Sequence, residues 1–325
     1  MFQVAVDRLE GVFSFDRILV FTVAEQAALL MEQCPEIPEE NFLLEPAPRG
    51  TASVVGLAAT ALQARDPQAI MAVLTADHFI ENVNGFQNLL RSAARVAQDG
   101  WLVTLGIQPT YPATGYGYIQ RGEKLDPNET ITAYRVLKFK EKPDEQTART
   151  FIEKGDHDWN SGMFIWRVDR ILDEIRTLMP ALQDTLRQIA DVWGTNEQDK
   201  VIQNVWGGIQ PQTIDYGIME KAQKVVVLPA GSLGWNDVGS WESLFDVLSA
   251  DEQGNIVLSA NHLAIDTQSS LICADYPKRL IVTIGVHDLV VVDTGDAVLI
   301  CPRSDSQRVK DVVSQLKQTG RTNYL

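Results

Sequence analysis

The chain has 325 residues, a formal net charge of −15 and a mean hydropathy of −0.08. It contains no apolar run of the about eighteen residues that a transmembrane helix needs, and its first residues do not form a signal peptide. Binding to nucleic acid is disfavoured, because neutralising many phosphates requires a basic surface. Composition and charge are therefore typical of a soluble globular protein, and they indicate neither a nucleic-acid nor a membrane partner.

The first part of the chain alternates between predicted strands and helices. Apolar strands are predicted at 17–22, 70–75 and 101–107, and helices at 23–33, 51–65 and 86–98, with Thr51 as a helix N-cap. Strands that alternate with helices are typical of βαβ units. We therefore predict the α/β class, with a Rossmann-like, mostly parallel sheet covered by helices on both faces.

The pattern changes after residue 108. Residues 112–119 form a loop that opens onto a strand, and we predict a strand at 131–139, a helix at 145–154, helices over 168–205 broken at Pro180 and Gly194, and a short helix at 241–249. From Gly254, short apolar strands separated by turns predict a small all-β domain, closed by a helix at 304–317. We predict a first domain over 1–250 and a second over 251–325.

The three cysteines, Cys34, Cys273 and Cys301, are far apart in the sequence. They show neither the spacing of a metal site nor a disulfide framework. We therefore expect free thiols in a reducing cytoplasm.

Two aspartates follow apolar segments in a way that indicates a metal site. Asp77 comes after the predicted strand at 70–75, and Asp237 lies between two glycines and two tryptophans in 234–241. Ligands bind outside the carboxyl ends of strands in open α/β sheets, and two carboxylates can hold Mg²⁺ against nucleotide phosphates. Alternatively, each aspartate caps a turn or helix.

Four further segments carry polar side chains suited to a ligand. The segment 45–52 opens a helix whose free N–H groups suit an anion or the edge of a base, or are simply capped. Glu141 could accept sugar hydroxyls and Lys142 could contact a phosphate, or both belong to a solvated strand end. Asn160 suits a hydroxyl, and Asp215 is either a ligand-site residue or an N-cap.

In order along the chain, the segments at 45–52, 73–78, 106–119, 139–144, 159–164, 211–220 and 233–241 closely resemble the mannose-1-phosphate guanylyltransferases of the bacterial type with a short β tail. The resemblance extends to Lys278-Arg279 and to 285–294. It implies a nucleotide-diphospho-sugar transferase fold over 1–250 and a β-helix-like domain over 251–325.

The resemblance also implies roles for individual residues. Asp77 and Asp237 would bind Mg²⁺ and, with Lys142, would be catalytic. The residues near the guanine would be Glu45, Thr51 and Ala52. The residues of the mannose site would be Gly115, Tyr116, Glu141, Asn160 and Asp215.

The implied reaction is attack of the mannose 1-phosphate oxygen on the α-phosphorus of GTP, giving GDP-mannose and pyrophosphate. Alternatives are another hexose 1-phosphate or nucleotide, or a non-catalytic paralogue that binds a sugar nucleotide. The apolar β tail leaves a homodimer open.

The chain departs from the family at three places. Family members begin with a strand and a Gly-Gly-x-Gly-Thr-Arg-Leu-x-Pro loop, whereas Met1-Phe2-Gln3 correspond to a helix after that loop. We therefore expect that about thirty residues, one βα unit, precede Met1 in the intact protein and include a central strand of the sheet. The family also has Asn at the position of Gly50 and Pro at the position of Thr75.

Overall fold

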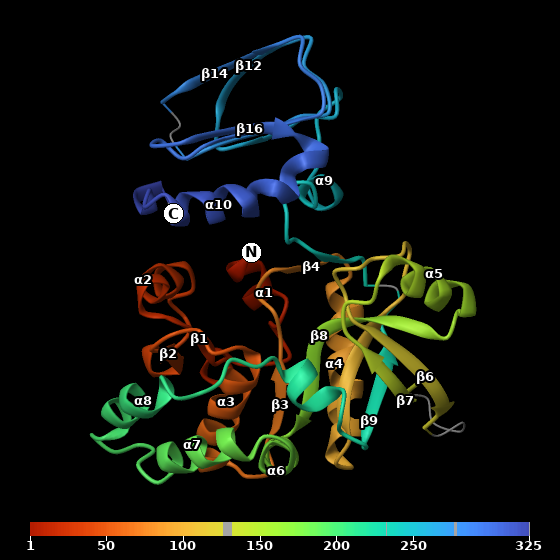
Figure 1. Ribbon diagram of the computed structural model, residues 1–325, viewed down its shortest axis with the longest axis vertical. Coiled ribbons are helices and arrows are strands. Elements are labelled where there is room, and N and C mark those ends of the chain that lie inside the picture. The colour runs from red at the N-terminus through yellow and green to blue at the C-terminus, as the bar shows by residue number, and fades with distance from the viewer. Residues whose placement is uncertain (126–131, 232, 276–277, 325) are drawn as a thin grey trace. The chain divides into compact units, whose positions relative to one another are not determined.

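The computed structural model describes residues 1–125, 132–231, 233–275 and 278–324 (Figure 1). The chain divides into two compact units, Met1–Ala76 with Ile80–Trp235, and Asp77–Phe79 with Asn236–Leu325. The expected domain boundary at residue 250 stays a prediction. Among the described residues, no helix combines the length and apolar character needed to cross a bilayer.

The first unit contains most of the helices and a six-stranded sheet in the order β3-β8-β5-β9-β7-β6. Its strands are β1 (Val20–Val23), β2 (Phe42–Glu45), β3 (Ile70–Val73), β5 (Leu102–Ile107), β6 (Tyr118–Lys124), β7 (Tyr134–Lys140), β8 (His157–Arg167) and β9 (Val225–Pro229). Its α-helices are α1 (Phe2–Asp7), α2 (Ala24–Gln33), α3 (Thr51–Arg65), α4 (Val83–Gln98), α5 (Glu145–Lys154), α6 (Val168–Leu178), α7 (Pro180–Ala190) and α8 (Gln198–Trp206). The strand expected at 131–139 corresponds to β7, which begins at Tyr134. Residue 131, the first of the expected range, lies outside the described residues.

The strand pairing corrects one part of the expectation. Strands β5 and β9 are parallel, as are β1 and β2, but β8 runs antiparallel to β3, β5 and β6, and β7 runs antiparallel to β6 and β9. The sheet is therefore mixed rather than mostly parallel. Buried apolar strands predicted a parallel sheet, but a long antiparallel strand covered on both faces, such as β8, has the same composition.

Two apolar layers cover the faces of this sheet. Leu102 and Phe164 belong to a core shared with α3, α6, α7 and α8, whereas Val103 and Ile165 belong to a core shared with α4 and α5. Neighbouring residues of one strand thus point to opposite helical layers, as the period of two in a strand requires. The three-layer α/β class predicted from the sequence is confirmed.

Strands β1 and β2 form a separate two-stranded parallel sheet beside α1 and α2. Val6, Val20, Cys34, Ile37 and Phe42 form its small core. The central strand that the resemblance implies is not among the described strands.

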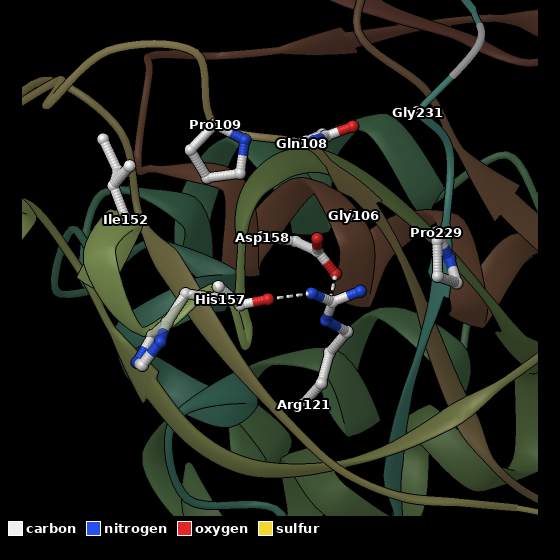
Figure 2. A pocket seen from close by; sticks show the side chains of 10 residues that line it. Gly106, Gln108, Pro109, Arg121, Ile152, His157, Asp158, Pro229 and Gly231 are labelled. Atoms are coloured by element: carbon white, nitrogen blue, oxygen red, sulfur yellow. Dashed lines mark hydrogen bonds and ion pairs between the residues drawn. The ribbon is translucent and has the colours of Figure 1, made fainter.

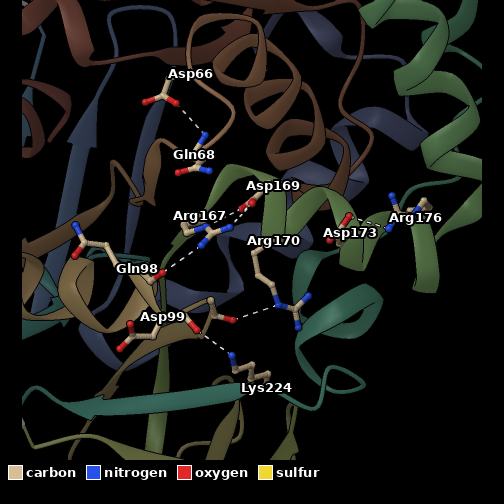
Figure 3. Close-up of polar contacts among 11 residues, drawn as sticks. Asp66, Gln68, Gln98, Asp99, Arg167, Asp169, Arg170, Asp173, Arg176 and Lys224 are labelled. Atoms are coloured by element: carbon tan, nitrogen blue, oxygen red, sulfur yellow. Dashed lines mark hydrogen bonds and ion pairs between the residues drawn. The ribbon is translucent and has the colours of Figure 1, made fainter.

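Basic side chains of the first unit donate to carbonyl groups at and just beyond the C-terminal end of α4 (Figure 3). Arg167 Nη1 donates to Gln98 O at 3.3 Å, Arg170 Nε to Gly100 O at 3.2 Å and Lys224 Nζ to Asp99 O at 2.9 Å. The last carbonyls of a helix lack partners within the helix, and cations stabilise that end of its dipole. These three cations therefore have a structural role.

The second unit is a small β structure. It contains β11 (Ile256–Leu258), β12 (Asn261–Ile265), β13 (Leu271–Ala274), β14 (Leu280–Ile284), β15 (Leu289–Asp293), β16 (Val298–Pro302), α9 (Leu244–Val247) and α10 (Val309–Gln318). Strands β11, β13 and β15 pair in parallel with β16 antiparallel to β15, and β12 pairs in parallel with β14. Strand β4 (His78–Ile80) pairs with β10 (Trp235–Asp237) where the chain passes between the units.

A core and an ion pair with a buried carboxylate hold this β structure together. Ile256, Leu271 and Val290 pack with Trp241 of the loop before α9. Arg279 Nη1 donates to both carboxylate oxygens of Asp293, at 2.9 and 2.8 Å, and Asp293 is only 3% exposed.

Candidate active site

Asn160 is the centre of a hydrogen-bonded cluster in the first unit. Its Nδ2 donates to Asp215 Oδ1 at 2.8 Å, and its Oδ1 accepts from Thr104 Oγ1 at 3.3 Å and from Gly162 N at 3.2 Å. These bonds fix the amide between β5, β8 and the π-helical turn η3 (Asp215–Met219). The expectation that Asp215 is only a cap does not describe its contacts, because it accepts from the Asn160 side chain.

Glu141 lies beside this cluster with a carboxylate oxygen that needs a donor. Its Oε2 is buried and accepts no hydrogen bond from the described residues. A Cβ on Gly117 would lie 2.3 Å from that oxygen, so the glycine makes room for it. Burial, together with the charges of Asp215 and Glu220, raises the pKa of Glu141 to about 7. A buried acceptor without a partner is costly unless a ligand supplies the donor.

The side chain of Lys142 adds a positive charge near Glu141 and Asp215. Its charge lowers the pKa of Glu141 and of Asp215, while burial raises the pKa of Asp215. Lys142 is exposed and has a φ of 43°, an uncommon conformation for a residue with a side chain. Such backbone conformations persist where surrounding structure holds them, often at ligand sites.

Aromatic rings form a group near the start of β6. The Tyr116 ring lies 5.1 Å from that of Trp159 and 5.5 Å from that of Trp235, both edge to face. Gly115 is exposed, and a Cβ there would meet no atom within 4 Å. The two tryptophans around Asp237 have different roles, because Trp241 packs in the core of the second unit instead.

The segment 45–52 is joined to the segment before η3. Ala52 N donates to Gln212 O at 3.1 Å, and Ile214 N donates to Thr51 Oγ1 at 2.9 Å. The N-cap of α3 is Gly50 rather than Thr51, and the Ala52 N–H is used within the protein. Glu45 Oε2 is buried without a hydrogen-bond partner among the described residues, and burial raises the Glu45 pKa.

Gly50 has a conformation that other residues adopt at high cost. Its φ is 83° and its ψ is 164°, a region used almost only by glycine, and a Cβ would lie 2.4 Å from Gln212 O. We expect Gly50→Ala to lower the free energy of unfolding by about 1–3 kcal/mol. Denaturant unfolding measures this, with Gly115→Ala as the control because that position is open. Equal stability of the two variants would contradict the backbone conformation described for Gly50.

Asp77 and Asp237 both belong to the second unit. Val238 N donates to Asp77 O at 3.3 Å. Burial and then the charge of Asp77 raise the pKa of Asp237, whereas the charge of Lys310 lowers it. Two carboxylates of like charge near one another are stabilised by a cation.

The donor chemistry of this pair suits a hard divalent cation such as Mg²⁺. Among the described residues, no group of three or more His, Cys, Asp or Glu side chains could hold a metal by itself. Mg²⁺ in such sites takes one or two carboxylates, with substrate phosphates and water completing its coordination. The donor set of Asp77 and Asp237 meets that requirement.

The structure adds site residues that the sequence did not single out. Thr104 holds Asn160, and Glu220 Oε1 accepts from the Glu141 backbone N at 3.3 Å. Glu220 comes five residues after Asp215, a spacing that a π-helical turn places on one side. No sequence pattern predicted the π-helical turn, but the two acidic residues Asp215 and Glu220 could have indicated that Glu220 belongs to the site.

Comparison with known proteins identifies the family. Residues 1–254 match the family model described as Nucleotidyl transferase. The chain belongs to the nucleotidyl transferase family. Residues 260–316 match the model described as MannoseP isomerase/GMP-like beta-helix domain. The predicted β-helix-like second part of this nucleotidyltransferase is therefore confirmed.

Individual relatives agree with this assignment. Mannose-1-phosphate guanylyltransferase from Escherichia coli K12 is 37% identical over 100% of this chain and 68% of its own length. Mannose-1-phosphate guanylyltransferase ManC from Salmonella typhimurium LT2 is 38% identical with the same coverage. A crystal structure described as mannose-1-phosphate geranyltransferase from Thermus thermophilus has a TM-score of 0.82 and 32% identity, covering 96% of this chain and 88% of that one. The resemblance inferred from the sequence is confirmed.

The raised pKa of Glu141 predicts a pH-dependent stability. Its pKa is about 7 in the folded chain against an ordinary value of 4.5, so the folded state disfavours the charged form. The resulting destabilisation is absent below about pH 4.5, grows as the pH rises and is complete above about pH 7. Without substrates, Glu141→Gln should therefore raise the melting temperature at pH 8 but not at pH 4.5. Thermal unfolding across this range, with the exposed Glu145→Gln as control, checks this; a shift of equal size at both pH values would contradict it.

Proposed function

We propose that this nucleotidyltransferase transfers GMP from GTP to mannose 1-phosphate, giving GDP-mannose and pyrophosphate. One observation carries the proposal beyond the family: the segment Gln212 to Asp215 contacts both groups of candidate residues. It bonds to Thr51 and Ala52 on one side and to Asn160 on the other. The same segment therefore holds the residues proposed to bind the base and the residue proposed to bind the sugar.

In this proposal, the buried carboxylates of Glu45 and Glu141 determine which base and which sugar the enzyme selects. Guanine presents two neighbouring N–H donors on its pairing edge, which suit the Glu45 oxygen that has no protein partner among the described residues. Sugar hydroxyls would donate to Glu141 Oε2, and Asn160 would orient them through its fixed amide. A site with a buried acceptor discriminates strongly against ligands that lack the matching donor.

Proposed catalysis consists of positioning and charge neutralisation. Bound by Asp77 and Asp237, Mg²⁺ would neutralise phosphate charge and polarise the phosphoryl oxygens. Lys142 would bind the phosphate of the sugar, and Glu141, Asn160 and Asp215 would hold the ring so that the phosphate oxygen faces the α-phosphorus. No protein nucleophile is needed, because the attacking oxygen belongs to the substrate.

A substrate panel tests this function. Pyrophosphate release would be measured for GTP, ATP, UTP and dTTP, each with mannose 1-phosphate, glucose 1-phosphate or galactose 1-phosphate, with and without Mg²⁺. We expect the highest kcat/KM for GTP with mannose 1-phosphate and no turnover without Mg²⁺. Faster turnover of another pair would replace the proposed substrates, and binding without turnover of any pair would favour a non-catalytic paralogue.

We further propose a homodimer through the outer face of β12 and β14. Leu263 pairs with Val282 and Ile265 with Ile284, and all four side chains are 47–64% exposed. A face without charged side chains keeps the repulsion between two copies of a chain with a charge of −15 low. The doubly substituted V282E/I284E should be monomeric by sedimentation, unlike the wild type and the control V312E on α10. A monomeric wild type at about 10 μM would refute the dimer.

A cytoplasmic location also belongs to the proposal. It is supported by Cys34, Cys273 and Cys301, which are all free thiols.

A further inference from the structure

A cavity lies in the first unit, outside the proposed catalytic residues (Figure 2). It is formed where β5 and β9 end, beside β6 and the turn from α5 to β8, and has a volume of about 340 Å³. Its lining includes Gly106, Gln108, Arg121, Ile152, Asp158 and Pro229. This volume is within the usual range for sites of small molecules. Glu141, Asn160 and Asp215 are not part of the lining.

Asp158 is a buried carboxylate in the wall of this cavity. The residue is 3% exposed, and its Oδ2 accepts no hydrogen bond from the described residues. The cation facing it is Arg121, whose Nε lies 3.5 Å from Oδ2, beyond a good hydrogen bond. Burial raises the pKa of Asp158 to about 6. A Cβ on Gly106 would lie 2.8 Å from Oδ2, so the carboxylate depends on that glycine for space.

Arg121 is held in position by the protein itself. Its Nη2 donates to Gly155 O at 2.6 Å, and its guanidinium lies 5.6 Å from the centre of the Tyr134 ring. Its charge close to Asp158 makes the cavity electrically balanced and unfavourable for a cation. An anion without hydrogen-bond donors would leave the Asp158 oxygen unsatisfied.

The remaining wall adds polar and apolar groups. His157 Nδ1 lies 2.6 Å from Asp156 Oδ1, its ring stacks on Phe151 with 4.1 Å between the ring centres, and burial lowers its pKa. Gln108 adds an amide that can both donate and accept. Ile152, Pro109 and Pro229 supply apolar surface.

We propose that this cavity binds a neutral polyhydroxylated molecule of about monosaccharide size. Hydroxyl groups provide the donor that Asp158 Oδ2 lacks, accept from the Gln108 amide, and carry no charge that Arg121 or Asp158 would repel. The carbon skeleton of such a molecule would contact Ile152 and the two prolines. This site does not depend on the proposed substrates of the enzyme.

Ligand-observed NMR titration of the whole protein with mannose, mannitol, choline and inorganic phosphate tests the proposal. We expect saturable binding of mannose or mannitol with a dissociation constant of about 1 mM, as for a ligand of this size. Asp158→Asn should weaken binding about tenfold or more, because a charged acceptor becomes neutral. Ile152→Trp, which fills the cavity from its α5 side, should abolish binding even if Asp158→Asn folds poorly.

Two controls separate this cavity from other sites. Glu153→Gln changes an exposed neighbour on α5, and Glu141→Gln changes the proposed catalytic sugar site; both should leave polyol binding within twofold. Absence of saturation up to about 50 mM would overturn the proposal, as would binding that survives Ile152→Trp or that Glu141→Gln removes. A preference for choline or phosphate over both polyols would also overturn it.

Discussion

Replacing Asp237 by alanine is expected to lower kcat by about a thousandfold or more, with the fold intact. Asp237 is half-buried, its pKa is raised by burial and by the charge of Asp77, and the pair fits one Mg²⁺. A missing ligand would weaken charge neutralisation at the phosphates, and each about 1.4 kcal/mol of lost transition-state stabilisation is tenfold in rate. Removing one of two like charges also relieves their repulsion, so the melting temperature should not fall.

Steady-state kinetics of the enzyme measures this effect. The control is Asp311→Ala, which removes an exposed carboxylate from α10 of the same unit and should keep wild-type kcat. Titration with Mg²⁺ should show a weaker apparent affinity in Asp237→Ala alone. A variant that retains more than about a tenth of wild-type kcat would exclude Asp237 from the metal site.

Glu141→Gln is expected to raise the KM for mannose 1-phosphate by about 10- to 100-fold. Hydrogen bonds to a charged partner contribute about 1.5–3 kcal/mol, and the Glu141 oxygen has no other partner among the described residues. The KM for GTP should change less than threefold, because Glu45 and not Glu141 is proposed to contact the base.

Initial rates with each substrate varied in turn measure the two constants. Glu145→Gln, an exposed change at the start of α5, serves as the control. An unchanged KM for mannose 1-phosphate would remove Glu141 from the sugar site, and an equal rise in both KM values would indicate a general disturbance instead.

The sequence predicted those features that local patterns encode. The helix at 145–154 agrees with α5 because Asp144 caps it and Gly155 ends it in a left-handed conformation. Most helices of the first unit and most strands of the second were also predicted. The resemblance to the family placed Glu141, Asn160 and Asp215 in one predicted sugar site, which periodicity alone could not do, and in the structure Asn160 donates to Asp215 while burial and the charge of Asp215 raise the pKa of Glu141.

Other features depend on contacts between distant parts of the chain. The antiparallel direction of β8 is set by its neighbours, since its composition suits either direction. The pairing of Thr51 with Ile214 makes Gly50 the N-cap of α3, although Thr51 is the better cap by residue type. Asp158 and Arg121 are distant in sequence but face each other across β6 and β8. No local pattern marks that pair.

The most direct test of the proposed reaction is to follow heavy oxygen from mannose 1-phosphate into the product. Mannose 1-phosphate with ¹⁸O in its non-bridging phosphate positions would be incubated with GTP, Mg²⁺ and the enzyme, and the products analysed by mass spectrometry. Attack of the sugar phosphate on the α-phosphorus predicts GDP-mannose that carries all the ¹⁸O, together with unlabelled pyrophosphate. Labelled pyrophosphate, or no GDP-mannose while another nucleotide sugar forms from a different pair, would contradict GMP transfer to mannose 1-phosphate.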